Sequence, residues 1–281
     1  MRTGTPMPEM KIGIVAAMER EVRPLIRGWK VRTIEHSGRR CRLFEYPNGD
    51  VALICGGIGA EAARRATEAL IEEVHPVRVL SVGFAGAVHG ALHRSLKVGD
   101  VLDPRTVINA ADGVRTEIGS GAGILVSSTT VAGREQKIRL GKAFGASAMD
   151  MEAAAVAQGA EARGVEFAAL KAISDDADFN VPELDRFVSP DGTFRSIAFA
   201  FHAALRPWLW WPTIALARNS SRASHALCGA LEAYLDREIS ADRGSTAPSM
   251  ASDRETDCGP MCAGAGALRA GGPHTRAKGK Q

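Results

Sequence analysis

The chain of 281 residues is 45% hydrophobic and 24% charged, which is typical of a globular protein, and its formal net charge of only +3 gives no broad basic surface for nucleic acid. Five cysteines, an odd count, argue against a secreted disulfide framework, and Cys258 and Cys262 have no nearby His or Cys with which to form a zinc site. No apolar run approaches the ~20 residues of a membrane span, and the N-terminus lacks a signal-peptide layout, so we expect a cytoplasmic protein.

Apolar runs bounded by turn residues predict strands that alternate with helices. The predicted strands are 11–17, 40–46, 51–55, 77–83, 101–107, 124–127 and 167–173. The predicted helices are 19–29, 60–74, 130–144 and 151–163. A hairpin signal at 47–50 separates two of the strands, so a purely parallel sheet is not expected. The pattern predicts an α/β fold with a central mixed, largely parallel sheet flanked by helices.

The C-terminal part is predicted to be helical over 194–205, to break at Pro207 and Pro212, and to form a further helix over 220–235. After Ser240 the sequence consists mainly of Ser, Ala, Gly, Pro and scattered charges, which cannot bury enough apolar surface to offset the entropy of ordering. We therefore expect a loose leader over 1–10, one domain over 11–236 and a disordered tail over 237–281.

Three separated segments, 13–21, 148–155 and 171–178, each place carboxylates beside an apolar run. In an open α/β sheet such strand ends are where ligands bind. Taken together, the three segments resemble the purine nucleoside phosphorylase and nucleosidase superfamily. The resemblance is closest to its 5'-methylthioadenosine/S-adenosylhomocysteine nucleosidase branch. It implies a site for a small-molecule nucleoside and no metal or organic cofactor.

Cleaving a purine from ribose builds negative charge on the base and positive charge on the sugar, so it needs an acid at the purine N7. Asp175 ends the apolar run 167–173, where desolvation would keep its carboxyl protonated. The resemblance gives Asp175, next to Ser174, this catalytic role. Judged on this segment alone, a cluster of aspartates more commonly caps a turn.

Two glutamates are candidates for the sugar side of the reaction. Glu21 lies in the first turn of a predicted helix, where the helix dipole favours the ionised form, and the resemblance implies that it activates water. The resemblance also implies that Met151 covers the sugar ring and that Glu152 accepts both ribose hydroxyls. Without it, a solvated first-turn glutamate is the preferred interpretation of Glu21, and a glutamate at a helix start explains Glu152 about equally well. Asp150 stands where the family more often has Glu, and we assign it no catalytic role.

Two glycine-containing turns complete the predicted site. Gly56-Gly-Ile-Gly59 gives a weak dinucleotide-binding signal, whereas the resemblance implies that Ile58 lies near the 5' substituent of the sugar. Phe84, Ala85 and Gly86 fall in the family's phosphate or water loop. The Arg and Ser that hexameric phosphorylases carry there are replaced by Ser81 and Phe84, which favours hydrolysis over phosphorolysis. The adenine-binding loop near 129–131 cannot be assigned.

The C-terminal part resembles the hopanoid-associated nucleosidases, which remove adenine from adenosylhopane. Three tryptophans, Trp208, Trp210 and Trp211, gather there. They could pack within the protein or across a homodimer, which we expect to form. Alternatively, they could form an apolar mouth for a lipid-like 5' group, or a peripheral membrane contact.

The sequence therefore predicts an enzyme that hydrolyses the N-glycosidic bond of a 5'-modified adenosine. The predicted substrate class is adenosylhopane, methylthioadenosine or S-adenosylhomocysteine, and adenine is released. The alternatives are a purine nucleoside phosphorylase and a non-catalytic nucleoside-binding protein.

Overall fold

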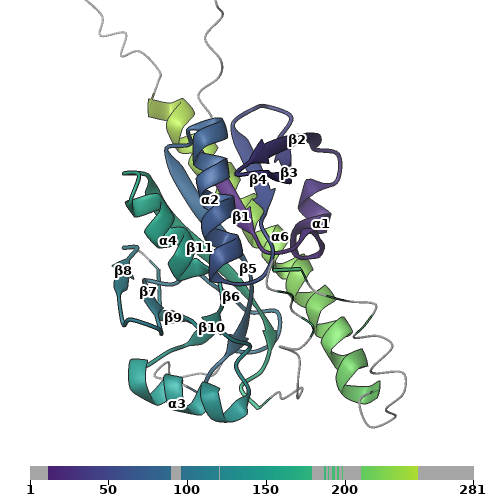
Figure 1. The fold of residues 1–281 in the computed structure, drawn as a ribbon, viewed down its shortest axis with the longest axis vertical. Helices are drawn as coiled ribbons and strands as arrows, with labels where there is room; N and C mark the ends of the chain where they lie inside the picture. The colour runs from purple at the N-terminus through teal and green to yellow at the C-terminus, as the bar shows by residue number, and fades with distance from the viewer. Residues whose placement is uncertain are drawn as a thin grey trace, which may run out of the picture.

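The computed structural model describes residues 12–89, 96–119, 121–178, 187, 189, 192–193, 195, 198 and 210–245 (Figure 1). The expected leader, nearly all of the predicted helix 194–205, and the tail after Ser245 lie outside the described residues. No helix in the described part of the chain has the length and apolarity needed to cross a membrane.

The core is one mixed sheet that branches at its fifth strand. Its strands are β1 (Ile12–Ala16), β2 (Lys30–His36), β3 (Arg39–Glu45), β4 (Val51–Cys55), β5 (Arg78–Ala87), β6 (Val101–Leu102), β7 (Thr106–Asn109), β8 (Arg115–Glu117), β9 (Ile124–Ser127), β10 (Ala148–Asp150) and β11 (Glu166–Asp175). The order is β2-β3-β4-β1-β5-β10-β9-β7-β8, and β11 pairs with β5 and β6. Strand β5 pairs in parallel with β1 and β11, and antiparallel with β10. The predicted mixed sheet is therefore confirmed.

Helices cover both faces of this sheet, as predicted (Figure 1). They are α1 (Glu19–Ile26), α2 (Ala60–Val74), α3 (Arg134–Phe144), α4 (Ala153–Glu161) and α6 (Trp210–Ser245). Val22 of α1 and Leu227 of α6 share one buried cluster with Ile14 of β1. On the other face, Ala63 of α2 and Val156 of α4 pack with Val15 of the same strand. Alternate residues of β1 thus face opposite helical layers, as the period of two in a strand requires.

Several predicted boundaries were wrong for local reasons. The predicted strand 101–107 is two short strands, because Pro104 lies between β6 and β7 and cannot donate a ladder hydrogen bond. The helix expected from 130 begins at Arg134, after Gly133 as its N-cap. The helix expected from 151 begins at Ala153. Strands β2, β8 and β10 were not predicted, since the first two are largely exposed and the last has only three residues.

The largest correction concerns α6, which runs unbroken from Trp210 to Ser245. Pro212 lies in the first turn, where the missing N–H has no helical partner to lose, so the residue starts the helix instead of breaking it. The helix also continues past 236, the predicted end of the domain. Glu238 forms an ion pair with Arg78, and Ile239 packs against the core, so these contacts hold residues that we had placed in the disordered tail.

Candidate functional site

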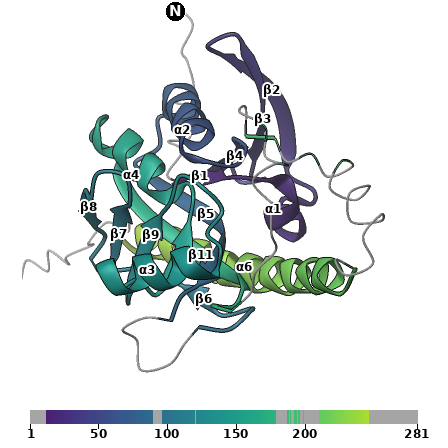
Figure 2. The ribbon, with the colours of Figure 1, turned by 60° about the horizontal axis from the view of Figure 1, so that its bottom comes forward.

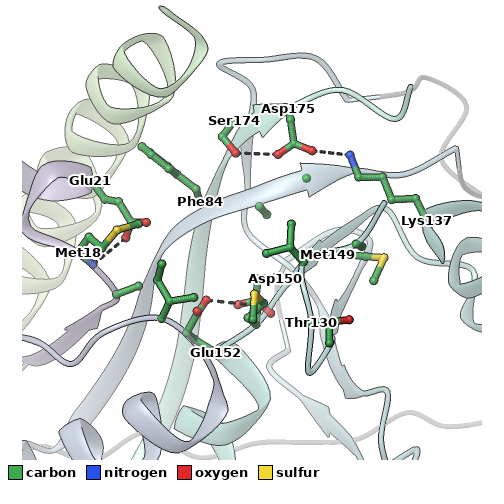
Figure 3. Close-up of a pocket in the computed structure, with 17 residues that line it drawn as sticks. Met18, Glu21, Phe84, Thr130, Lys137, Met149, Asp150, Glu152, Ser174 and Asp175 are labelled. Carbon is green, nitrogen blue, oxygen red and sulfur yellow. Dashed lines mark hydrogen bonds and ion pairs between the residues drawn. The ribbon is translucent and has the colours of Figure 1, made fainter. Parts of the chain in front are cut away.

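A cavity of about 180 Å³ opens where the carboxyl ends of β1, β10 and β11 meet the end of β5 (Figure 3). All nine predicted site residues line it: Glu21, Ile58, Phe84, Ala85, Gly86, Met151, Glu152, Ser174 and Asp175. The lining residues that were not predicted are Ala17, Met18, Thr130, Val131, Ala132, Lys137, Met149 and Asp150. Segments far apart in sequence thus converge on one cavity, as the sequence analysis expected.

One end of the cavity holds an ion pair between Asp175 and Lys137 (Figure 3). Lys137 projects from α3 and is buried; its Nζ donates to Asp175 Oδ2 and, at 2.7 Å, to the backbone oxygen of Asp176. The Ser174 hydroxyl donates to Asp175 Oδ1 at 2.9 Å. The sequence analysis expected burial alone to keep a proton on Asp175. The structure instead places an ammonium group against it, because α3 passes the end of β11.

Gly86 makes room for this ion pair. A Cβ atom at position 86 would lie 2.7 Å from Asp175 Oδ2 and 3.1 Å from Lys137 Cε, closer than atoms can approach without something moving. Gly86 also pairs with Asp175 in the final step of the ladder between β5 and β11, after an irregularity between Ile173 and Asp175. The predicted site residue Gly86 therefore acts here through its missing side chain.

The opposite side of the cavity holds Glu152, the N-cap residue of α4 (Figure 3). The backbone N–H of Gly59 donates to Glu152 Oε1 at 2.7 Å, and that of Met151 donates to Oε2 at 3.3 Å. Burial, and then the nearby Asp150, raise the pKa of Glu152 to about 7, although Lys171 and the two N–H groups act in the other direction. The carboxylate is thus held in one orientation, facing the cavity.

Lys171 and Asp150 form a buried ion pair behind Glu152, with 2.9 Å between Nζ and Oδ2. Asp150 also accepts from the Ser127 hydroxyl at 2.5 Å and from the Ala153 N–H at 2.9 Å. Burial acts to lower the pKa of Lys171, but Asp150, Glu152 and Glu21 outweigh it, so the pKa is raised and the lysine stays charged. Asp150, to which we assigned no role, fixes the start of α4 and holds this lysine in place.

Glu21 lies in the first turn of α1, and its side chain turns inward to the cavity. Its Oε2 accepts from the backbone N–H of Met18 at 3.3 Å, the reach of an N3 glutamate back to the N-cap. A Cβ at Gly83 would lie 3.1 Å from this oxygen. Burial, and then Glu152, raise the pKa of Glu21 to about 7. The expectation that the helix dipole keeps Glu21 ionised was wrong, because desolvation of the buried carboxyl is the larger effect.

The two lysines are the functional residues that sequence reasoning missed. Lys171 stands inside the apolar run of β11, and a lone lysine in such a run was a usable signal of a buried charge. Lys137 gave no such signal, because it belongs to a polar helix with several other charged residues. Within the described residues, no three His, Cys, Asp or Glu side chains are placed to hold a metal ion.

The fold and this site define an enzyme class. The sequence model described as "Phosphorylase superfamily" matches residues 11–128 and 118–198, and the chain belongs to this superfamily.

Among its relatives is a 5'-methylthioadenosine/S-adenosylhomocysteine nucleosidase of Actinobacillus succinogenes, 31% identical over 205 residues, which are 60% of this chain and 87% of the relative. The nucleosidase of the same name from Colwellia psychrerythraea, solved with adenine, is 26% identical, with a TM-score of 0.50 over 61% of this chain and 86% of that chain. The S-adenosylhomocysteine nucleosidase of Streptococcus pyogenes shares the fold with a TM-score of 0.60, 20% identity and coverage of 83% and 99% of the two chains.

Proposed function

We propose that the protein hydrolyses the N-glycosidic bond of a 5'-modified adenosine and releases adenine. The observation that carries this proposal is the separation of the cavity into two chemically different ends. Asp175 and Lys137 can serve the purine, while Glu21 and Glu152 can serve the ribose and water (Figure 3). The nucleosidase relatives and the superfamily membership support the same reaction.

At the base end, the Lys137–Asp175 pair holds one transferable proton. As the C1'–N9 bond breaks, its electron pair moves onto the purine, and one proton passes from the Lys137 ammonium through Asp175 to N7, which leaves Lys137 neutral and Asp175 ionised. Preorganised donors aimed at developing negative charge are a large source of rate enhancement. Ser174, bonded to the other carboxylate oxygen, keeps Asp175 in position.

At the sugar end, Glu152 accepts hydrogen bonds from the ribose hydroxyls and Met151 lies against the ring. A water molecule attacks C1' and gives a proton to Glu21, whose pKa of about 7 suits a general base that operates near neutrality. The new bond joins the water oxygen to C1', and the products are adenine and the free 5'-modified ribose.

Water is a better nucleophile than phosphate in this cavity. Lys137 is the cation among the described lining residues, and it is engaged by Asp175 at the base end. The sugar end presents two carboxylates, which would repel a phosphate dianion. Ser81, at the position of the phosphorylase arginine, is buried in β5 and does not line the cavity.

Adenine release from methylthioadenosine, measured with and without inorganic phosphate, tests the proposal. We expect release that does not depend on phosphate. Release only with phosphate would identify a phosphorylase, and binding without release would identify a nucleoside-binding protein. The Asp175→Asn variant is the control, because it retains the cavity but not the acid.

Adenosylhopane is a second candidate substrate, suggested by the tryptophans near the start of α6. Trp211 is 78% exposed in the first turn of α6, whose N-terminal end projects past the sheet (Figure 1). Trp208 and the side chain of Trp210 lie outside the described residues. If the three line an approach for lipid, their replacement by Ala should lower kcat/KM for long-chain 5'-alkyl adenosines more than for methylthioadenosine. Equal losses would contradict the idea.

The homodimer and the membrane contact stay predictions.

A further inference from the structure

A second cavity, of about 460 Å³, adjoins the first and shares Phe84 with it. Its remaining lining residues come from α1 and α6: Arg20, Arg23, Pro24, Arg27, Ser220, Ser221, Ser224 and His225. We call this cavity the arginine groove. Figure 2 shows α1 lying beside α6, the two helices that form its walls.

The arginine groove is strongly positive. Its three arginines are spaced three and four residues apart, so they share one face of α1, and arginine stays charged at every relevant pH. None of the described residues that line it is acidic. Several arginines elsewhere on the surface are paired, as Arg42 is with Glu19 and Arg64 with Glu61.

Arg23 and Arg27, by contrast, have no ion pair within the described residues. Guanidinium groups suit carboxylates and phosphates, which they bind through two parallel hydrogen bonds. The groove therefore has the chemistry of an anion site.

The walls of the groove are fixed against each other. The Ser224 hydroxyl of α6 donates to the backbone oxygen of Glu21 at 2.9 Å, and Leu227 packs with Val22 and Leu25 in the core. Helix α1 consequently presents Glu21 to the first cavity and Arg23 to the second from one rigid element. A site held in place in this way loses little conformational entropy when a ligand binds.

The position of the groove relates it to one end of the substrate. With the purine at Asp175 and Lys137, the ribose lies between Glu152 and Glu21, and its 5' carbon points to the opposite end of the cavity. Met18, Glu21 and Phe84 form that end (Figure 3). A 5' substituent that continues in this direction passes Phe84 and enters the arginine groove.

We propose that the arginine groove binds an anionic group, a carboxylate or a phosphate, at the far end of the 5' substituent. The inference rests on the proposed function. It defines the substrate as an adenosine whose 5' carbon carries a short apolar linker, which lies against Phe84, followed by a negative charge at Arg23 and Arg27.

Two matched compounds test this inference: 5'-(3-carboxypropylthio)-5'-deoxyadenosine and its primary amide, which has nearly the same shape and no charge. We expect kcat/KM to favour the carboxylate by about tenfold, a preference that charge-assisted hydrogen bonds can supply. In the Arg23→Gln/Arg27→Gln variant the preference should fall to about twofold or less. Raising the salt concentration to 0.5 M should reduce the preference of the wild-type protein, since it screens exposed charges.

The matched control is Arg39→Gln/Arg115→Gln, which removes two exposed arginines that lie outside both cavities. It should keep the full preference, and both double variants should cleave methylthioadenosine at the wild-type rate. Equal kcat/KM for the two compounds, or a preference that Arg23→Gln/Arg27→Gln leaves intact, would overturn the inference while the proposed function stands.

Inorganic phosphate is the other source of an anion. If phosphate accelerates methylthioadenosine cleavage and Arg23→Gln/Arg27→Gln abolishes the acceleration, the groove holds a cosubstrate and the inference is wrong. If the protein releases adenine from no compound, the proposed function fails. Calorimetric binding of the carboxylate and the amide then tests the groove by itself, and equal affinities would reject it.

Discussion

The two ends of the first cavity use the same kinds of side chain in different proportions. At the base end one carboxylate, Asp175, meets one ammonium group, Lys137. At the sugar end three carboxylates, on Glu21, Asp150 and Glu152, surround the single ammonium group of Lys171. Charge is balanced at the base end and left unbalanced at the sugar end.

This difference determines what each end can do. At the sugar end, burial and mutual repulsion leave Glu21 and Glu152 with pKa values of about 7, so one of these carboxyls can accept a proton from water near neutral pH. At the base end, the ammonium group of Lys137 donates to Oδ2 of Asp175, so this carboxylate lies directly beside a proton donor. In the proposed mechanism, the carboxylates at the sugar end therefore provide the base, and the balanced pair at the base end provides the acid.

The largest expected effect comes from breaking the base end. Asp175→Asn should lower kcat for methylthioadenosine by about 10²–10⁴-fold, because an amide cannot pass a proton to N7. Binding of the nucleoside should change little, which calorimetry can measure. A variant that keeps more than a tenth of the wild-type rate would remove Asp175 from the mechanism.

Removing only the cation at the base end should cost less. Lys137→Met should lower kcat by about 10²-fold, the loss typical of one electrostatic donor. The loss should fall on kcat and leave the affinity for the nucleoside nearly unchanged, as measured by calorimetry, because the negative charge on the purine develops only as the bond breaks. Lys142→Met, an exposed lysine of the same helix, is the control. An equal loss of nucleoside affinity would indicate that Lys137 only supports the structure of the cavity.

The carboxyls of the sugar end should make both the free energy of unfolding and kcat depend on pH. Because the pKa values of Glu21 and Glu152 rise from 4.5 to about 7, the folded protein holds protons that the unfolded chain releases between these values. The free energy of unfolding should therefore fall as pH rises from about 4.5 to about 7, by a few kcal/mol at most. The value of kcat should instead rise with pH, by about tenfold between pH 6 and 8, as Glu21 loses its proton.

Urea denaturation and initial rates at pH 5, 6, 7 and 8 give both quantities. The Glu21→Gln variant should reduce the slope of the stability profile, leaving the part due to Glu152, and abolish the pH-dependent part of the rate. Stability and activity that rise together with pH would contradict the assignment of raised pKa values to the sugar end.

The sequence predicted the cavity-lining carboxylates of both ends, but not the lysine of the base end. Carboxylates that follow apolar strands could be placed at one edge of a sheet, which is why Asp175, Glu152 and Glu21 all reach the cavity. The partner Lys137 could not be found in this way. Its approach to Asp175 depends on where α3 begins, and that start differs from the predicted one by four residues (130 against 134).

The rest of the fold shows the same division. Alternating apolar runs predicted the central strands and α2, since burial on a regular period is a local property of the sequence. The continuity of α6 through Pro212 and past 236 depends on contacts between distant residues, such as that of Glu238 with Arg78. Composition made the segment after 236 resemble a tail, and only the tertiary partners show that its first residues belong to the domain.

The smallest expected effect tests whether Glu152, at the sugar end, binds the ribose hydroxyls. Glu152→Gln keeps the shape of the side chain, but its NH2 group cannot replace one of the two oxygens that accept from the N–H groups of Gly59 and Met151, and only one oxygen is left to accept from two ribose hydroxyls. In the wild-type protein, 2'-deoxy-methylthioadenosine should therefore lose more kcat/KM, relative to methylthioadenosine, than it does in the variant. The two penalties should differ by a few-fold, which corresponds to the net value of about 1 kcal/mol typical of one hydrogen bond. Glu161→Gln, at the exposed end of the same helix, should leave the wild-type penalty unchanged. If the penalty is equal in the wild-type protein and in Glu152→Gln, Glu152 does not bind the 2' hydroxyl and serves only to hold the backbone at Gly59 and Met151.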